Sequence, residues 1–475
     1  MPLIRKQQIL IKKEASEGVS ASPGASDVMT IFDPNYSDTV DQLERNPAGG
    51  SLSRGFSSVG RSSRQITFQS ELRGSGDTTL TVDDPEWGPA AESAGLVKRT
   101  FKKVTLGAVT GTGFQIGEVV SQSSGAIRGI VLGAFTSGGV LTHLLNTSGG
   151  HLAVVPIVGT FTAAATTGES SGATATASAV ADYEGHAYGP TSEKLTQVSV
   201  ASWSGGTPAV GESLDVEVSG AKVGGVLVIA DNAGGAFTSM NVTLMWGQML
   251  NGNTLRTANG AGTGTISADP VQIRTPSVTA RHNLDGRRRD SLGARANFDL
   301  AANVGEPAVF SWTLQGDLGP AIDAQPIATT GASTIRAPRM LGSMHAYGRG
   351  ANIYRLPTKS FGLQLGNSIN PNLDGNRTGG STGTNVTDRT PELVFQTDMV
   401  HGAFDWESIR DQATALRVVH LLGSTKGNIV GVVAPNAQVT QANVADANGV
   451  AAQDITANPR RVLESGDDEF FLVQL

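Results

Sequence analysis

The chain has 475 residues, a formal net charge of −7, 60 glycines and no cysteine. The missing cysteine excludes disulfide frameworks, thiolate zinc sites and cysteine nucleophiles. The negative charge argues against a protein that grips nucleic acid by neutralising phosphates, and the abundant Gly, Ser, Thr, Ala and Val favour short strands and turns over helices.

Length and hydropathy set the expected number of domains. At about 150 residues per domain the chain suits two to four domains, and 39% hydrophobic residues are enough for a packed core. No apolar run approaches the roughly 18 to 20 residues of a membrane span. The charged residues 1–13 are not followed by the apolar stretch of a signal peptide, so we expect no membrane insertion by this chain.

Residues 1–60 predict an extended N-terminal arm. They show few apolar periodicities and many Ser, Gly, Asp and Pro residues. Such a segment buries little of its own surface and gains order by lying on another chain, which favours an oligomer. The alternative is a partly disordered tail.

Residues 61–101 predict the first part of a β-rich core. Ile66, Phe68 and Leu72 alternate with polar neighbours, as in a strand with one buried face. A short helix is expected to begin near Pro89 and to end at Gly95.

Residues 102–185 contain a weak internal duplication. Phe114 and the Ser-Ser-Gly-Ala run at 123–126 both recur later in the segment, as Phe161 and as a second Ser-Ser-Gly-Ala run at 170–173. The number of residues between the two copies is the same in both cases. Both copies alternate small and β-branched residues between glycines, which predicts inserted Gly/Ser/Thr-rich β-modules that project outwards. Residues 210–214 predict a further insertion at about 203–265. Long padded loops are the alternative for all of these segments.

Residues 186–475 predict the second part of the core. Alternating apolar residues indicate strands over 277–279, 292–300, 309–316 and 359–367, with a hairpin turn at Asp285-Gly286. The Gly-rich span 372–383 is expected to be a mobile loop.

The last 85 or so residues predict a strand over 391–395 and then a helix over 405–416. Asp405 is the expected N-cap, and Phe404 is expected to pack on Ile409. The expected apolar face of this helix consists of Trp406, Ile409, Ala413 and Leu416. A strand from Val430 is expected to end at Pro435-Asn436. A turn at 446–449 and a closing strand over 469–473 complete the chain.

Residues typical of catalysis or metal binding lack a convincing arrangement. Residues 168–172 match Gly-x-Ser-x-Gly, but no strand before and helix after are predicted, and chance matches are common in a Gly- and Ser-rich chain. The seven histidines show no metal-ligand spacing. The acidic run at 83–86 suits a solvated turn better than a cation site. The three arginines at 287–289 could contact phosphate, but an exposed hairpin tip facing acidic surface of a neighbouring subunit fits better. We therefore expect no enzyme, no cofactor and no metal site.

Several short runs, in order, resemble the tail tube (major tail) proteins of long-tailed bacteriophages. They are the opening Lys12-Lys13-Glu14, the strand, glycine turn and short helix over 65–95, the strands between 272 and 316, and the C-terminal runs 423–428, 433–438, 446–449 and 467–471. The resemblance covers roughly residues 1–101 and 186–475, in patches. It implies a mainly β protein: an antiparallel β-sandwich or barrel core with a short flanking helix, plus small inserted β-domains.

The same resemblance implies a structural virion protein. Its subunits would form rings, hexameric by analogy, that stack into a hollow tail made in the host cytoplasm. Its partners would be its own copies and the tail terminator and tail-tip proteins, while the tape measure protein and DNA would pass through the lumen without specific binding. A mildly acidic lining would repel phosphate at short range. The alternative is that the net charge of −7 only keeps the protein soluble.

Three other functions remain open from the sequence. The chain could be another virion component, such as a tail-tip, baseplate or head-decoration protein. The Gly-Ser-Thr repeats also suit a surface adhesive or carbohydrate-binding β-protein. A polysaccharide-cleaving enzyme would need a carboxylate cleft, which spacing alone does not reveal.

Overall fold

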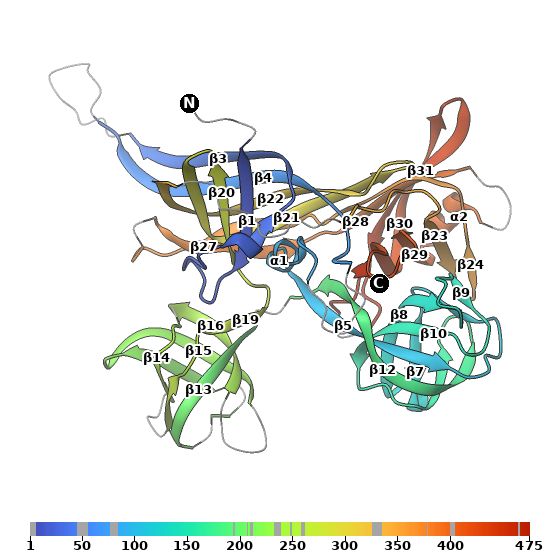
Figure 1. Ribbon diagram of the computed structural model, residues 1–475, viewed down its shortest axis with the longest axis horizontal. Coiled ribbons are helices and arrows are strands. Elements are labelled where there is room, and N and C mark those ends of the chain that lie inside the picture. The colour runs from blue at the N-terminus through green and yellow to red at the C-terminus, as the bar shows by residue number, and fades with distance from the viewer. Residues whose placement is uncertain are drawn as a thin grey trace.

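The computed structural model has a mainly β fold with antiparallel pairing throughout its named strands, which confirms the predicted fold class. The structure describes residues 6–44, 56–76, 84–192, 195–206, 208–209, 212–231, 239–247, 249–257, 262–324, 335–377, 379–399, 404–463 and 466–475. A core body lies at the top of Figure 1, and two small barrels lie beneath it.

The core body consists of two repeats with the same order of elements. The first repeat contains β1 (Gln7–Lys13), β2 (Val28–Met29), β3 (Phe32–Leu43), β4 (Ser58–Glu71), α1 (Gly88–Ser93), β20 (Val278–Leu284), β21 (Arg287–Asn303) and β22 (Val309–Asp323). The second repeat contains β23 (Met344–Arg349), β24 (Asn352–Tyr354), β25 (Thr358–Gln364), β28 (Glu392–Asp398), α2 (Trp406–Asp411), β29 (Ala415–Leu422), β30 (Val430–Ala447) and β31 (Val450–Pro459).

Strand pairing is the same in both repeats. The first repeat has the order β2-β1-β20-β21-β22-β4-β3. The second has the order β24-β23-β29-β30-β31-β28-β25. In each repeat the short helix directly follows the strand at the corresponding place, β4 or β28. This agreement of element order and of six pairings identifies an internal duplication of the core.

The two repeats are joined edge to edge through β21 and β25. The result is one open antiparallel sheet with the order β3-β4-β22-β21-β25-β28-β31-β30, which we call the joined sheet. Alternate residues of its strands are buried on one face, as the period of two in a strand requires. The buried aromatic residues of this face are Phe68, Phe298, Phe310, Trp312, Phe361 and Phe395.

Both helices cover this apolar face. Trp87, the N-cap of α1, lies with its ring centre 5.6 Å from that of Phe310, and Trp406, the first residue of α2, lies 5.3 Å from Phe395. As predicted, Pro89 stands in the first turn of α1, and Gly95 follows the helix with a φ of +85°, a conformation that glycine adopts without strain. The helices therefore seal one side of the joined sheet and leave its other face uncovered by them.

The first barrel is inserted after α1. Its strands are β5 (Leu96–Leu106), β7 (Val119–Gln122), β8 (Ile127–Phe135), β10 (His151–Val158), β11 (Ala165–Gly168) and β12 (Thr174–Pro190). They close in the order β5-β10-β8-β7-β11-β12-β5. The short strands β6 (Phe114–Gln115) and β9 (Leu144–Leu145) pair beside them. The two copies of the duplicated sequence are thus two hairpins of one barrel, because neither hairpin alone could enclose a core.

The second barrel follows directly. Its strands are β13 (Leu195–Gly205), β14 (Ser213–Val218), β15 (Ala221–Asp231), β16 (Ser239–Gly247), β17 (Thr254–Thr257) and β18 (Gly262–Ile266), and β19 (Val271–Arg274) adds to β13. They close in the order β13-β16-β15-β14-β17-β18-β13. Numbered along the chain, both barrels have the order 1-4-3-2-5-6. The two insertions are therefore copies of one topology, and the insertion predicted at about 203–265 falls within the second.

The two barrels share a local turn as well as a topology. Three of the strands are preceded by a turn in which two residues, three positions apart, bond to each other. The side-chain oxygen of the later residue accepts a hydrogen bond from the backbone N–H of the earlier one. The backbone N–H of the later residue donates to the carbonyl of the earlier one. The three pairs, which precede β7, β14 and β17, are Gln115 with Glu118, Ala209 with Glu212, and Leu250 with Asn253. Each turn satisfies its own backbone groups where the strand begins.

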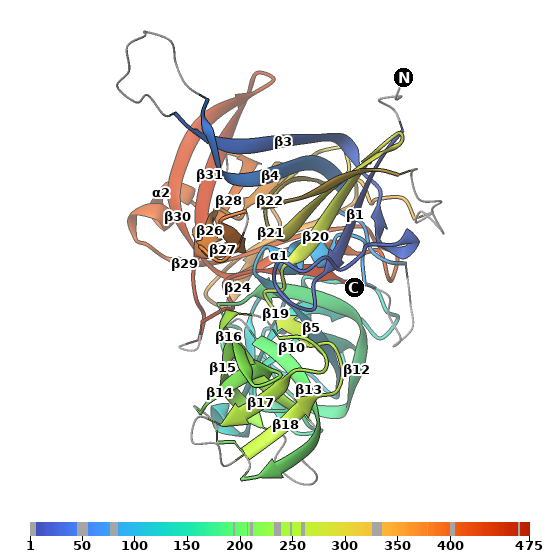
Figure 2. The ribbon, with the colours of Figure 1, turned by 90° about the vertical axis from the view of Figure 1, so that its left-hand side faces the viewer.

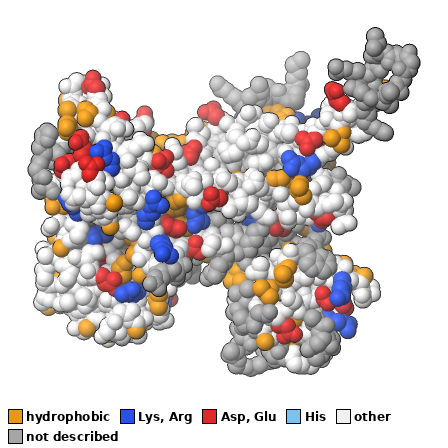
Figure 3. Space-filling view, turned by 180° about the vertical axis from the view of Figure 1, so that it is seen from behind, with side chains coloured by type: hydrophobic (Ala, Val, Ile, Leu, Met, Phe, Trp, Pro, Cys, Tyr) orange, Lys and Arg blue, Asp and Glu red, His pale blue; other side chains and the backbone are white. Residues whose placement is uncertain are grey.

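Each barrel lies beside a different repeat of the core, on the same side of the body (Figures 1 and 2). The first barrel shares one buried cluster with the second repeat, including Val419, Leu421 and Val433, and β12 pairs with the C-terminal strand β32 (Phe471–Gln474). The second barrel has a separate buried cluster of its own. Figure 3 shows the two barrels as distinct lobes below the core body.

The N-terminal residues differ from the predicted arm. β1 lies inside the sheet, paired with β2 and β20, and its side chains Ile9, Leu10 and Ile11 are buried. The pairing partner is β20, more than 250 residues away in the sequence, so no local pattern could reveal it. Residues 1–5 and 45–55 of the predicted arm lie outside the described residues.

The predicted C-terminal helix is shorter than expected. Asp405 caps α2 as predicted, and Phe404 and Ile409 are buried in the same core. Ala413 has a φ of +48° and ends the helical turn, and Leu416 belongs to β29 instead, where the run of apolar and β-branched residues favours a strand. The helix therefore covers the core with only six residues.

Two further expectations are corrected in the second repeat. β30 continues past Pro435, although proline has no N–H to donate to a neighbouring strand. The pairing of β29 with β30 has a bulge between Leu416 and Val418, and a β-bulge tolerates a proline. The described residues of 372–383 belong to the hairpin of β26 (Asn367–Leu373) and β27 (Ser381–Arg389) and its turn. Thr384 of β27 donates a 2.8 Å hydrogen bond to the Gln315 carbonyl of β22, so the hairpin is held on the first repeat.

Candidate assembly surface

The face of the joined sheet opposite the helices is polar. Between the buried positions stand amides and hydroxyls, of which the central ones are Gln65, Gln69, Asn297, Ser311, Thr313, Gln364, Gln396, Asn443 and Thr456. All nine are exposed or half-buried. We call this surface the polar face.

The charged side chains of the polar face are mainly acidic. Its carboxylates include Glu71, Asp299, Glu392, Asp398 and Asp454. Asp454 accepts a 2.7 Å hydrogen bond from the facing amide of Gln396, and the ammonium of Lys359 lies 2.9 Å from Asp398, so that cation is already paired. Partial burial raises the pKa of Asp299. The surface offers hydrogen-bonding groups and negative charge, and little to attract phosphate.

The joined sheet ends in two edges that have no partner strand among the described residues. β3 pairs with β4 only, and the second half of β30, from Val439 to Ala447, pairs with β31 only. These stretches are long, and the hairpins that carry them lie at opposite ends of the core body in Figure 1. Apolar side chains stand exposed beside both edges: Val59 and Leu43 near β3, and Val444, 65% exposed, on β30. Free strand edges of this kind pair with other chains.

The Gly-x-Ser-x-Gly run has a packing role in the first barrel. Ser171 donates from its N–H and its hydroxyl to the Glu118 carboxylate, at 3.1 and 3.2 Å. Glu118 is buried, and burial raises its pKa. Ser171 therefore ties the turn before β12 to the strand entry before β7. The central serine of the run, Ser170, stands in this turn between the strands β11 and β12, so the strand-turn-helix context of a nucleophile elbow is not formed here.

The acidic and basic runs singled out in the sequence are engaged in ion pairs. Asp84 pairs with Lys98 and Glu86 with Arg73, each at 2.5 Å, while Asp83 lies outside the described residues. In the triple-arginine run, Arg288 pairs with Asp290 at 3.0 Å, and the Arg289 guanidinium lies 4.2 Å above the Tyr36 ring. These two arginines make contacts within the first repeat. The expected contact of this run with a neighbouring subunit stays a prediction. Within the described ranges, His, Asp and Glu form no group of three or more that could hold a metal ion.

Two of the seven histidines meet in the core of the second repeat. The Nδ1 atoms of His345 and His420 lie 2.9 Å apart on paired strands, and the His420 ring stacks on Phe361 with centres 4.6 Å apart. Burial lowers the pKa of His345 to about 4 and that of His420 well below its usual range. The pair shares one hydrogen bond between neutral rings and is a packing feature. His401 lies outside the described residues.

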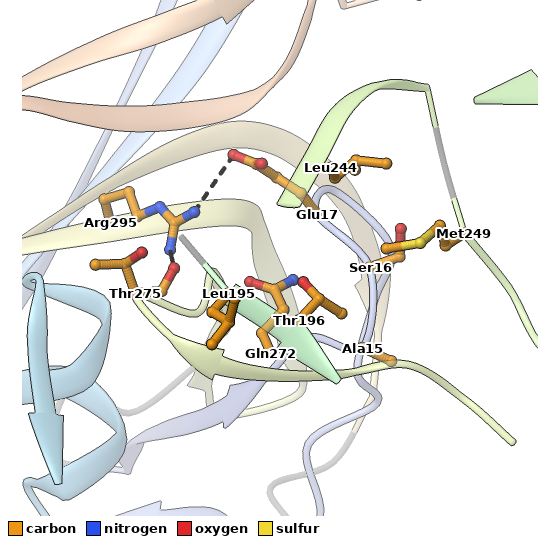
Figure 4. A pocket seen from close by; sticks show the side chains of 10 residues that line it. All are labelled: Ala15, Ser16, Glu17, Leu195, Thr196, Leu244, Met249, Gln272, Thr275 and Arg295. Atoms are coloured by element: carbon orange, nitrogen blue, oxygen red, sulfur yellow. Dashed lines mark hydrogen bonds and ion pairs between the residues drawn. The ribbon is translucent and has the colours of Figure 1, made fainter. Parts of the chain in front are cut away.

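A small hollow marks the joint between the second barrel and the first repeat (Figure 4). Arg295 enters it from β21, donates to the carbonyls of Thr275 and Thr384, and lies 3.6 Å from the Glu17 carboxylate. Burial lowers the pKa of Arg295, and the nearby carboxylates oppose this effect. Leu195 and Met249 of the barrel line the other side. With its cation already bonded to protein groups, this joint positions the barrel against the first repeat.

Comparison with known proteins does not show a family for this chain. A scan against protein-family models and a search of curated proteins both gave no match. In the described part of the chain no helix has the length and apolar character needed to cross a bilayer.

The duplication of the core was missed in the sequence, although a signal exists. Residues 66–72, Ile-Thr-Phe-Gln-Ser-Glu-Leu, and residues 393–399, Leu-Val-Phe-Gln-Thr-Asp-Met, are similar in size at every position and in polarity at every position except the second, where Thr67 corresponds to Val394. Each run is the strand before a short helix. A comparison of the two halves of the chain anchored on Phe68 and Phe395 would have found it.

Proposed function

We propose that this protein is a structural subunit of a tube: copies form closed rings, the rings stack, and the polar faces of the joined sheets line a channel for DNA. The observation that carries the proposal is the joined sheet itself, which has one sealed apolar face, one polar face and two free edges. Pairing the edges of successive copies extends the sheet, and closing it into a ring removes every edge.

The chemistry of the polar face supports a conduit for nucleic acid. A channel must let phosphate pass without holding it, and binding grows with each phosphate that a Lys or Arg neutralises. The face instead presents amides, hydroxyls and the carboxylates Glu71, Asp299, Glu392 and Asp454. Together with the resemblance to tail tube proteins, this favours a non-enzymatic virion component of a long-tailed bacteriophage, made in the host cytoplasm, with tape measure protein and DNA in the lumen and terminator and tip proteins at the ends.

Negative-stain electron microscopy of the purified chain tests the proposal. Annular particles or hollow rods are expected. Monomers that bind glycans would instead support the adhesin, a function that the two largely uncharged, Gly- and Thr-rich barrels would suit.

A second test addresses the channel. Gln69 and Gln396 occupy corresponding positions of the two repeats on the polar face. Rods of the Q69K/Q396K variant should retain double-stranded DNA at low salt and release it as salt rises, whereas wild-type rods should not. The matched control, T167K/T176K, places the same number of lysines on the surface of the first barrel, at Thr167 of β11 and Thr176 of β12, which are both exposed. If rods of the control retain as much DNA as rods of Q69K/Q396K, the polar face does not line the channel.

A further inference from the structure

We propose that each chain occupies two successive positions of the ring, and that β30 of one copy pairs with β3 of the next in the register that β21 and β25 use within the chain. The inference rests on the proposed ring. It adds which residues meet and how many chains close it.

The junction inside the chain provides the template. β21 and β25 pair antiparallel, with Asp299 opposite Gln364, Leu300 opposite Leu363 and Ala301 opposite Gly362. Leu300 and Leu363 are fully buried between the two repeats. Because β30 is the counterpart of β21, and β3 the counterpart of β25, the free edges are the two halves of a second junction of this kind.

The register on β30 follows from its paired neighbours. Leu300 pairs with Phe310, and Phe310 pairs with Ser70 on β4. In the second repeat, Val444 pairs with Gln453, and Gln453 pairs with Thr397 on β28. Ser70 and Thr397 are the same position of the two matching runs, so Val444 is the counterpart of Leu300.

The register on β3 follows in the same way. Tyr36 pairs with Ile66, and Leu363 pairs with Leu393, the residue that corresponds to Ile66. Tyr36 is therefore the counterpart of Leu363. In the assembled ring Val444 of one copy faces Tyr36 of the next. The flanking contacts on the polar face are Asn443 with Ser37 and Ala445 with Asn35.

This arrangement explains two features of the isolated chain. Val444 is an apolar residue left 65% exposed on an edge strand, and the proposed contact buries it as Leu300 is buried. The direction of the strands also fits, since the joined sheet alternates from β3 to β30 and the next β3 would again be antiparallel. The backbone groups of both edges gain hydrogen-bond partners.

The width of DNA sets the number of chains. Each chain contributes eight strands to the ring, spaced about 4.8 Å apart, and this spacing sets the circumference and so the diameter of the ring. Side chains that point into the bore reduce the diameter by about 10 Å. A ring of two chains then has a channel about 14 Å wide if the strands run along the axis, and about 22 Å wide if they are tilted by about 40°. Three chains give about 27 to 38 Å by the same estimate. B-DNA, with a major groove about 8.5 Å deep, needs about 20 Å. Three chains, which present six repeats, form the smallest ring that passes the duplex with clearance at either tilt.

Cysteine cross-linking tests the register, because the chain contains no cysteine of its own. In assembled S37C/N443C protein, oxidation or a short bis-maleimide should give a ladder of covalent species that ends at three chains. D299C/Q364C, the internal counterpart, should close within one chain and calibrates the geometry. T39C/N443C, displaced by two residues on the same face, should link far less. Equal linking of T39C/N443C, an unlinked S37C/N443C pair beside a closed internal pair, or a ladder that ends at six would overturn the inference.

A charge at the edge gives an independent measurement. V444D should remain a folded monomer in size-exclusion chromatography and circular dichroism under conditions where wild type assembles. V450D, at a residue that is also exposed but lies at the hairpin tip outside the register, should assemble normally. Assembly of V444D would overturn the inference. Cross-linked trimers that never stack would contradict the tube function and still support the proposed register. Hollow rods in which the S37C/N443C pair stays unlinked would support the tube function and contradict the register.

Discussion

Removal of one barrel at a time is expected to have opposite results, because the barrels are attached differently. Leu96 pairs with Pro190 where the first barrel begins and ends, and Leu195 pairs with Arg274 in the second, so a short glycine linker can replace either insertion. Deletion of 195–274 removes a barrel whose buried side chains form a cluster of their own. The remaining core should fold, and should assemble as wild type does.

Deletion of 97–189 should unfold the second repeat. The first barrel covers five large side chains of that repeat and of β32, all fully buried: Val419, Leu421, Val433, Phe471 and Val473. At about 1.5 to 3 kcal/mol for each such side chain, their exposure costs about 8 to 15 kcal/mol as an upper estimate. That loss equals the whole stability of a typical domain, about 5 to 15 kcal/mol.

Circular dichroism melts, size-exclusion chromatography and negative staining of both deletions check this prediction. We expect Δ195–274 to melt within a few degrees of wild type and Δ97–189 to aggregate. Polar substitutions of Val419 and Leu421 in Δ97–189 should partly restore solubility, which separates lost coverage from a folding defect elsewhere. A soluble Δ97–189 with an unchanged melting temperature would refute the shared core, and a Δ195–274 that folds without assembling would make the second barrel an assembly element.

Three further predictions concern single sites. Glu118→Ala leaves the N–H groups of Ser171 and Gln115 without their acceptor, and should destabilise the protein by about 2 to 4 kcal/mol in urea unfolding. The stability of Glu118→Gln should lie between those of Glu118→Ala and wild type. Equal stability of all three proteins would contradict the role given to this carboxylate. Because His345 and His420 are held neutral, the unfolded chain binds protons that the folded chain excludes, so stability is lost as pH falls below about 6.5. The stability difference between wild type and H345N/H420N should therefore narrow by about 2 kcal/mol or more from pH 7 to pH 5, and a difference independent of pH would count against burial of the pair. Gly293 has a φ of +58°, and a Cβ there would lie 2.5 Å from the β27 backbone, so Gly293→Ala should lower the melting temperature clearly while Gly375→Ala, in open space, should not.

The resemblance and the local patterns led to the fold class and to several elements. The alternation around Phe68, the Pro89 to Gly95 helix, the Asp285-Gly286 turn and the Asp405 cap each depend on residues within one turn or one strand, where side-chain period and backbone conformation are set locally. Errors arose where a distant partner decided the outcome. Leu416 fits a helical stripe by spacing, yet pairing with β30 makes it a strand residue.

The sequence by itself determined which stretches could form strands with one apolar face, where the turns between them lie, and that the chain could not rely on disulfides or thiolate metal sites. Tertiary structure alone decided that β1 pairs with β20, that two hairpins close into one barrel, and that two repeats share a sheet with two free edges. The physical reason is that a strand satisfies its backbone through partners that can lie anywhere in the chain, so its pattern specifies a face but not a neighbour.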